Sequence, residues 1–434
     1  MGGKSSIIMV LGFGFIMGYV SLNLNRIATT SVANTSTYYD MTAAHNLAVT
    51  GAYVGLAKVY ETPTWVGTIS QDLSDSVMKG TFTARMDTIG QWKARMRSVS
   101  AYSMNSSTTL RDTIDVYFDR IRENSFSMFA WMTNVETMGS GTPIYWITKD
   151  TVWGRVHSNG NMYIDGKPVF MDKATTAKGF KAGTGGNHAV FKNGYETGVA
   201  KIQFPDNLND LVHASEVTVP RYGRKFTSEV WLSLSAGLPG TDDDGVVYVR
   251  NTRTGPIVDS VRLSDPAFNG VIVGTTIVHV QGTLDGRLSI ASLTDMYIED
   301  DVLCASSPAS NPSSNDMLGL ISERNVIVAD NAANNDNCFI EGSIFCRLGG
   351  FRAENHDSRG ISKVLGVTGS IVQDARGPVG TFSGSSITNG FSKRYRYDPR
   401  LSDPTVRPPC YPGFFAKTLA ISNWWESYRV MSFQ

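Results

Sequence analysis

The segment "SSIIMVLGFGFIMGYVSLNLN", residues Ser5–Asn25, contains no charged side chain and decides the fold of the N-terminal region. As a helix rising 1.5 Å per residue it spans about 30 Å, the thickness of a bilayer's hydrocarbon core. The alternative is a cleaved secretory signal, and Ser31–Ala33 resembles a cleavage site. The apolar region of such a signal, however, has only about 7–15 residues. The longer run therefore predicts a membrane-spanning helix that the chain retains.

A second apolar pattern extends this helix. Residues 27–60 contain no proline, and apolar residues recur at spacings of three and four, which is typical of a helix with one buried face. The members of this stripe are Met41, Ala44, Ala48, Ala52, Leu56 and Val59. Pro63 ends the pattern. We expect one continuous helix of about 55 residues within a first domain, 1–62.

Three features of this region resemble the type IV pilins. They are Gly2-Gly3-Lys4, the apolar run from Ile7, and "TAAHNLAVTGAYVGLAKV" from Thr42. The resemblance is closer to the PilX-like minor pilins and to an uncharacterised group of bacterial surface, pilus-associated proteins. Major pilins carry a glutamate at the fifth mature position. Here that position is Ser5, or Ile8 if cleavage follows Gly3, so the major-pilin pattern is not met.

The resemblance implies a structural role and a location. The helix would anchor a precursor in the inner membrane, then form the core of an extracellular filament at the cell surface. Its partners would be further copies of the chain, as a helical homopolymer, or other pilins. The implied filament and membrane residues are Ile7, Ile8, Val10, Leu11, Phe13, Gly14, Phe15, Gly18, Val20 and Leu22. Gly14 and Gly18 form a GxxxG pair that lets helices approach closely, or are ordinary membrane-helix glycines.

The pattern after Pro63 changes to alternation. "GTFTARMDTI" from Gly80, "GQWKARMRSVSAY" from Gly90 and "TTLRDTIDVYF" from Thr108 alternate apolar and polar residues. They predict antiparallel strands with one buried face. With the helix end they form a small, pilin-like α+β head, 63–145.

Two similar phrases point to a different architecture further on. "GRVHSNGNMYIDGKPVF" begins at Gly154 and "GRLSIASLTDMYIEDDVL" at Gly286; "EGSIF" and "TGSIV" form a second echo. Short apolar runs, echoed and separated by turn residues, predict a β-helix or solenoid, with a β-sandwich as the alternative. We expect a β-helix-like domain at 146–390 with an excursion at about 174–268. A proline-rich, aromatic tail follows at 391–434, and the fold class is α+β to mostly β.

The resemblance to the surface-protein group continues through this region. The matching phrases are "WITKDTVWGRVHSNGNMYIDGKPVF" from Trp146, "GLISERNVIV" from Gly319, "GSIVQDARGPVGTF" from Gly369 and "YRYDPRL" from Tyr395. The resemblance therefore spans most of the chain. It implies no particular chemistry.

The composition and motifs argue against several functions. The 39 basic and 39 acidic residues give a net charge of +0 and form no basic stripe, so no nucleic-acid partner is expected. No HExxH, GxSxG, P-loop or GxGxxG motif occurs, and six histidines are scattered. We expect no catalytic residue, no cofactor and no metal. Asp242-Asp243-Asp244-Gly245 lacks the alternating spacing of a calcium loop and is interpreted as a turn.

A membrane-anchored β-helix that binds or cleaves carbohydrate is the alternative function, with a glycan or surface ligand as partner. Its carboxylates would include Asp165, Glu299, Asp300 and Asp301, but turn formation explains these residues. Trp424 and Trp425 would stack on a sugar, cap the solenoid or pack on the helix. We favour capping.

Four cysteines, Cys304, Cys338, Cys346 and Cys410, form an even set that suits disulfides outside the cell. An extended strand between Cys338 and Cys346 would hold their sulfurs about 25 Å apart, so these two should pair with other partners unless Glu341-Gly342 makes a tight corner. Of the three connectivities that four cysteines allow, we favour Cys304–Cys338 with Cys346–Cys410. Unpaired buried thiols are the alternative.

Overall fold

The computed structural model divides the chain into two compact units. The first consists of Met1–Arg122 and Phe415–Gln434, and the second of Glu123–Phe414. The described residues are 3–74, 79–89, 93–104, 108–121, 123–237, 243–383, 386–415 and 419–426, so Gly2 of the pilin-like start lies outside them. In sequence, the second unit is an insertion into the first. These bounds differ from the four segments expected above, because the last residues return to the first unit.

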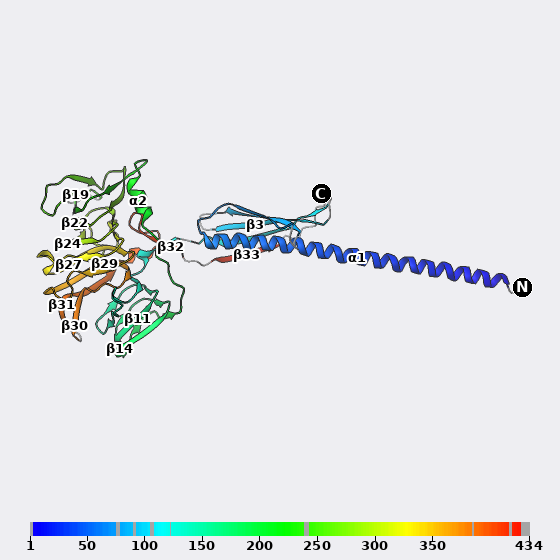
Figure 1. Cartoon of the computed structure of the whole chain (residues 1–434), viewed down its shortest axis with the longest axis horizontal. Coiled ribbons are helices and arrows are strands. Elements are labelled where there is room, and N and C mark those ends of the chain that lie inside the picture. Colours follow the sequence, from blue (N-terminus) through cyan, green and yellow to red (C-terminus); the bar gives the residue numbers. More distant parts are fainter. Residues whose placement is uncertain are drawn as a thin grey trace. The chain divides into compact units, whose positions relative to one another are not determined.

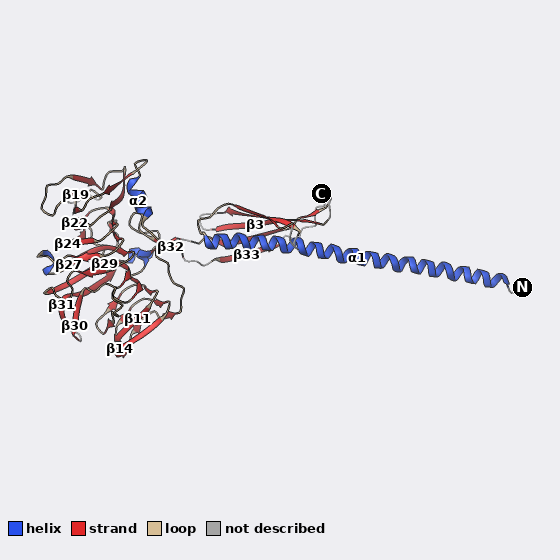
Figure 2. Cartoon of the chain, viewed as in Figure 1, coloured by secondary structure: helices blue, strands red, loops and turns tan. Residues whose placement is uncertain are grey.

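One helix, α1 (Gly3–Glu61), dominates the first unit (Figures 1 and 2). It is unbroken over 59 residues, which confirms the continuous helix expected from the sequence. The predicted stripe is buried at Ala44, Ala48, Ala52, Leu56 and Val59. Met41, the first member, is 38% exposed, so the buried face begins one turn later than predicted.

An antiparallel sheet covers the buried face of α1. Its strands are β1 (Thr68–Asp72), β2 (Gly80–Thr88), β3 (Lys93–Ser103), β4 (Thr109–Leu110), β5 (Thr113–Asp119) and β33 (Ala420–Glu426). Their order is β1-β2-β3-β5-β33, with β4 paired to β3. Along β2, β3 and β5 every second residue is buried, as the alternation predicts. The helix and these strands share one apolar core, which makes the first unit an α+β fold.

Two glycines bring α1 close to this sheet. A methyl group at Gly51 would lie 2.3 Å from Ser98 Oγ and 2.7 Å from a ring carbon of Phe82. At Gly55 it would lie 2.5 Å from the sulfur of Met96. Glycine at both positions therefore sets the distance between helix and sheet.

The second unit consists mainly of short strands. The first are β6 (Glu123–Ser125), β7 (Trp131–Val135), β8 (Trp146–Ile147), β9 (Thr151–Val152), β10 (Val156–Ser158), β11 (Asn161–Gly166), β12 (Val169–Phe170), β13 (Ala174–Thr176), β14 (Gly179–Asn187), β15 (Val190–Phe191), β16 (Tyr195–Thr197), β17 (Tyr222–Phe226), β18 (Val230–Ser235), β19 (Val246–Arg250) and β20 (Asp259–Arg262). The rest are β21 (Phe268–Gly274), β22 (Val278–Leu284), β23 (Arg287–Ser292), β24 (Met296–Cys304), β25 (Met317–Ser322), β26 (Val326–Val328), β27 (Cys338–Cys346), β28 (Phe351–Ala353), β29 (Ile361–Ala375), β30 (Gly380–Ser383), β31 (Ser386–Tyr397) and β32 (Gly413–Phe415). The helical segments are α2 (Asn209–Glu216), η1 (Phe126–Met128), η2 (Ala333–Asn335) and η3 (Pro399–Ser402).

Most of these strands belong to one large mixed sheet. Parallel pairing links β21, β23, β25, β27 and β29 in turn, and continues through β7 to β10, β13 and β16. A second parallel series links β18, β22, β24, β26 and β28. Each strand therefore pairs mainly with the strand after next. Within residues 174–268, β13, β16, β17 and β18 also pair with strands of this sheet.

The echoed phrases form the same local structure. The first gives β10 and β11, the second β23 and β24, and each pair of strands is separated by a tight corner. At these corners Ser158 Oγ accepts a hydrogen bond from Gly160 N, and Ser292 Oγ from Thr294 N, both at 3.2 Å. Ser322, opposite Ser292 in the neighbouring strand, does the same for Arg324 N. The repeated serine turns the corner by satisfying a backbone amide that the strand leaves free.

Candidate functional site

The first half of α1 is a continuous exposed apolar surface. Its large apolar side chains from Ile7 to Leu22 are between 44% and 80% exposed, the extremes being Val20 and Phe15. Added methyl groups at Gly12, Gly14 and Gly18 would meet nothing within 4 Å. Within the described part of the chain, α1 alone is long and apolar enough to cross a membrane. This surface requires lipid or other apolar helices as its environment.

The second unit contains a cavity of about 240 Å³, where three of the phrases noted above meet. Residues from Trp146 to Trp153 form one side, and residues from Lys393 to Tyr397 on β31 form another. The rest of the lining comes from Ala130 and Trp131, from Val367, Gly369 and Ile371 on β29, and from Arg376 just after β29. The parallel pairing of β29 with both β7 and β31 brings these distant segments together.

Aromatic rings form much of the cavity wall. Trp131 and Tyr395 are stacked with centroids 5.9 Å apart, and Trp131 meets Trp146 edge to face at 5.2 Å. Trp146 is 3% exposed, and its Nε1 has no hydrogen-bond partner among the described residues. Trp153 is 54% exposed and offers an accessible ring. Such a wall suits a ligand with an apolar face.

Two ion pairs lie beside these rings. Arg376 Nη1 is 2.7 Å from Glu136 Oε2, and its guanidinium lies over the rings of Trp131 and Trp146. Lys393 Nζ lies 3.2 Å from Asp150 Oδ1. Burial lowers the pKa of Lys393, and the negative charge of Asp150 opposes that shift. Burial also raises the pKa of the Tyr395 hydroxyl, which therefore stays protonated near neutral pH.

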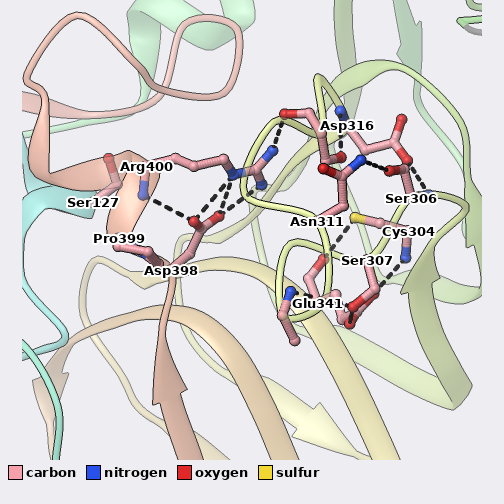
Figure 3. A network of polar contacts seen from close by, with 12 residues as sticks. Ser127, Cys304, Ser306, Ser307, Asn311, Asp316, Glu341, Asp398, Pro399 and Arg400 are labelled. Carbon is pink, nitrogen blue, oxygen red and sulfur yellow. Dashed lines mark hydrogen bonds and ion pairs between the residues drawn. The ribbon is translucent and has the colours of Figure 1, made fainter.

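A polar network fixes the chain just after β31 (Figure 3). Asp398 accepts a hydrogen bond from Arg400 N at 3.0 Å and pairs with the Arg400 guanidinium at 2.7 Å. Arg400 also donates to the carbonyl oxygen of Ser314. Tyr397 donates to the carbonyl of Met128 at 3.1 Å. These bonds hold Tyr395 and Tyr397 in place. In the "YRYDPRL" phrase, the two tyrosines therefore line the cavity, and Asp398 and Arg400 fix the chain that follows them.

Two further carboxylates of this network, Glu341 and Asp316, also hold the chain in place. Glu341 accepts hydrogen bonds from Cys304 N at 2.9 Å and from the Ser307 hydroxyl. Asp316 accepts from Ser306 N at 2.8 Å and from Gly286 N at 2.6 Å. Each carboxylate is engaged in holding the loop between β24 and β25, as Figure 3 shows for the Glu341 and Asp316 contacts. The arrangement stabilises this loop.

The cysteines do not form the expected pairs. All four are free thiols, with Cys304, Cys338 and Cys346 buried and Cys410 exposed. Because Val302 lies opposite Ile340, Cys304 lies about four residues from the level of Cys338, roughly 13 Å along the strand. Cys346 is buried at the end of β27, whereas Cys410 is exposed. Cys338 and Cys346 occupy opposite ends of that extended strand, as expected.

The carboxylates considered for metal or catalysis accept hydrogen bonds from backbone amides or from other side chains. Asp165 accepts a hydrogen bond from Gly185 N, and Asp301 from Phe339 N. Glu299 pairs with His279, which lowers the pKa of that carboxyl. Asp242 lies outside the described residues, and the neighbouring Asp243 receives a hydrogen bond from Asn315. No group of metal-ligating side chains is found among the described residues.

Trp424 and Trp425 do not have the capping role expected from the sequence. They lie on β33, which pairs with β5 in the first unit, so they do not cap the large sheet. Trp424 packs against Tyr53 of α1 with ring centroids 5.3 Å apart, while Trp425 is 61% exposed. Packing on the helix, the third option weighed above, is what Trp424 does.

The comparisons with known proteins give limited relationships. Residues 83–179 match a family described as a domain of unknown function, DUF4900. No curated protein matches the chain. Among solved structures, the competence-associated pilin ComZ from Thermus thermophilus matches with a TM-score of 0.34 and 9% identity, covering 91% of this chain and 98% of that chain.

Sequence reasoning missed most of the cavity. Trp146 and Tyr395 begin phrases that were singled out, but nothing in either phrase indicates that the two meet. Arg376 lies within the phrase that begins at Gly369, but the sequence indicated no role for it, and Lys393 lies outside the quoted phrases. The available signal was the density of aromatic and basic residues in "KRYRY", from Lys393.

Proposed function

We propose that this chain is a structural subunit of an extracellular, type IV pilus-like filament. One observation carries the proposal. The single unbroken helix is apolar and exposed in its first half, and in its second half one face is buried against an antiparallel sheet. The first half would be held in the inner membrane before assembly. It would then exchange lipid for the equivalent helices of neighbouring subunits.

Lipid and neighbouring helices would both keep these side chains out of water, where each large aliphatic or aromatic side chain left exposed costs about 1.5–3 kcal/mol. The preference for helices over lipid would come from close packing between the helices. Gly14 and Gly18 leave a small-residue face on which another helix would approach closely. Because Ser5 or Ile8 replaces the glutamate of major pilins, assembly here would depend on packing and not on that ion pair.

The second unit would be the displayed part of the subunit. We propose that its parallel series form a β-helix-like stack, in which the serine corners recur from one coil to the next. The in-register pairing of β23, β25, β27 and β29 supports this arrangement. The carboxylates described above are engaged by backbone amides, which supports a role without catalysis.

Isolation of surface filaments from the native cells tests the filament role. The chain should be identified in the filament by mass spectrometry, and images should show a repeating array of its β unit. Its absence from every filament preparation would contradict the proposal.

A pair of variants separates filament assembly from membrane insertion. Gly14→Leu keeps the segment apolar, so the chain should still fractionate with membranes, but the added bulk should prevent its incorporation into filaments. Thr35→Val, at an exposed position of α1 beyond the apolar segment, is the matched control and should assemble normally. Normal incorporation of the Gly14→Leu chain would show that this helix face does not pack in the filament.

A membrane-anchored carbohydrate-binding or carbohydrate-cleaving protein is the second candidate, and the aromatic cavity favours it. The two functions respond differently to removal of residues 1–25. A binding or cleaving protein should keep its activity when released from the membrane, whereas a filament subunit should lose assembly.

A further inference from the structure

We propose that the cavity between the Trp146–Trp153 segment and β31 binds a carboxylated sugar residue of an acidic polysaccharide. This goes beyond the filament proposal and does not depend on it, because every lining residue belongs to the second unit. The proposal rests on an aromatic wall, a local excess of positive charge and hydrogen-bonding groups held at the cavity.

The aromatic wall accounts for the sugar ring. Trp153 lines the cavity and is 54% exposed, although a large aromatic side chain gains free energy when covered. The C–H face of a pyranose carries partial positive charge and stacks on the electron-rich face of an indole. Tyr397, anchored to the carbonyl of Met128, supplies a second ring in the lining.

The charge distribution accounts for the carboxylate. Five lining residues are basic, namely Lys149, Arg376, Lys393, Arg394 and Arg396, and Asp150 is the acidic one. Glu136 pairs with Arg376 and Asp150 pairs with Lys393, so the positive charges of Arg394 and Arg396 give a local excess of two. The whole chain has a net charge of +0, so this excess is local. It favours an anionic ligand over a neutral one.

The rim carries the uncompensated part of this charge. Arg394 and Arg396 are exposed on β31, and neither makes an ion pair within the part of the chain that the structure describes. Because successive side chains of a strand point to opposite faces, Arg394 and Arg396 face away from Lys393, Tyr395 and Tyr397. Their positive charges would therefore attract an anionic polysaccharide over a distance, while Lys393 and the aromatic rings make the contacts on the cavity side.

The donors at the cavity are partly unused. Lys393 has three N–H donors, and its distances to the two Asp150 oxygens, 3.2 and 3.4 Å, are longer than the 2.7 Å of the Arg376–Glu136 pair. A ligand carboxylate would add a charge-assisted hydrogen bond at Lys393, and Asp150 would accept from a sugar hydroxyl. The Trp146 N–H, without a partner among the described residues, would be satisfied by a ligand oxygen or an ordered water.

Calorimetric titration of the full-length chain in detergent tests the proposal. The probes are a galacturonate oligosaccharide, the matching neutral galactose oligosaccharide, polyglutamate as an anion without sugar rings, and a single-stranded oligonucleotide. We expect the galacturonate to bind at least about tenfold more tightly than each of the others, and its affinity to fall as salt is raised. An equal or higher affinity for any of the other three probes, or no binding of galacturonate, would overturn the proposal.

Two variants locate the site. Trp153→Ala removes an exposed ring and should weaken galacturonate binding at least about tenfold without lowering the melting temperature. Trp425→Ala removes a tryptophan outside the cavity that is 61% exposed, against 54% for Trp153, and should leave binding unchanged. A double substitution, Arg394→Gln with Arg396→Gln, should weaken binding and flatten its salt dependence. If Trp153→Ala binds as tightly as the native chain, the cavity is not the site.

The titration also separates this proposal from the filament role. It requires no assembled filament, so failure of the filament experiments leaves it unaffected. Analysis of the galacturonate after prolonged incubation should show intact chains, and shortened chains would contradict a purely binding site.

Discussion

Arg376 and Glu136 form a buried ion pair although they are 240 residues apart in the sequence. Arg376 Nη1 lies 2.7 Å from Glu136 Oε2, and the two side chains are 2% and 0% exposed. Glu136 also accepts hydrogen bonds from Trp131 Nε1 at 3.0 Å and from Thr133 Oγ1 at 2.7 Å. The pair therefore ties the loop after β7 to the chain that follows β29, and it supports the wall of the cavity.

Glu136→Ala should be strongly destabilising. The substitution leaves the Arg376 guanidinium buried without a counter-charge, which typically costs about 3–5 kcal/mol. The free energy of unfolding of the second unit, measured by urea denaturation of the full-length chain in detergent, should fall by this amount. Lys363→Gln is the control, because Lys363 and its partner Asp336 are 69% and 60% exposed, and should change stability by less than about 1 kcal/mol. Similar effects from both variants would show that burial of the Arg376 pair is not decisive.

Gly51→Ala should destabilise the first unit even though alanine favours helix. The helix propensity gain is about 1 kcal/mol, but the new methyl group would lie 2.3 Å from Ser98 Oγ and 2.7 Å from Phe82. Overpacking of this kind costs about 1–3 kcal/mol, so we expect a lower melting temperature by circular dichroism in detergent. Gly18→Ala makes the same exchange on the same helix with nothing within 4 Å, and should not lower the melting temperature. A more stable Gly51→Ala chain would mean that helix and sheet are not held this closely.

The parts of the fold that follow from local periodicity were predicted well. The helix stripe from Ala44 to Val59 and the alternation within β2 and β3 express contacts with one neighbouring surface. Spacings along the chain are sufficient to reveal such contacts. Pro63 marked the end of the helix because it cannot donate the backbone hydrogen bond that a further turn requires.

The parts that depend on distant pairing were not predictable in the same way. β33 joins β5 at the edge of the first sheet, and nothing in "NWWESYRV" specifies that partner. The cavity depends on β29 pairing with β31 along its first part and with β7 along its last part, on the edge opposite β27, which brings Trp131 and Tyr395 into contact across 264 positions of sequence. The echoed phrases indicated that local structure repeats, but not which strands pair.

The four thiols should differ sharply in their reactivity toward iodoacetamide. Burial raises the pKa of Cys338 and of Cys346 to about 12, and raises that of Cys304 as well, so almost no reactive thiolate is present at pH 8. Cys410 is exposed and should be alkylated first, at a rate that increases with pH, while the other three react only after denaturation. Mass spectrometry of peptides from native and urea-treated protein, purified without reductant, measures each site. A peptide linking Cys304 to Cys338, or Cys346 to Cys410, would instead establish the disulfides expected from the sequence and show that the chain rearranges on oxidation.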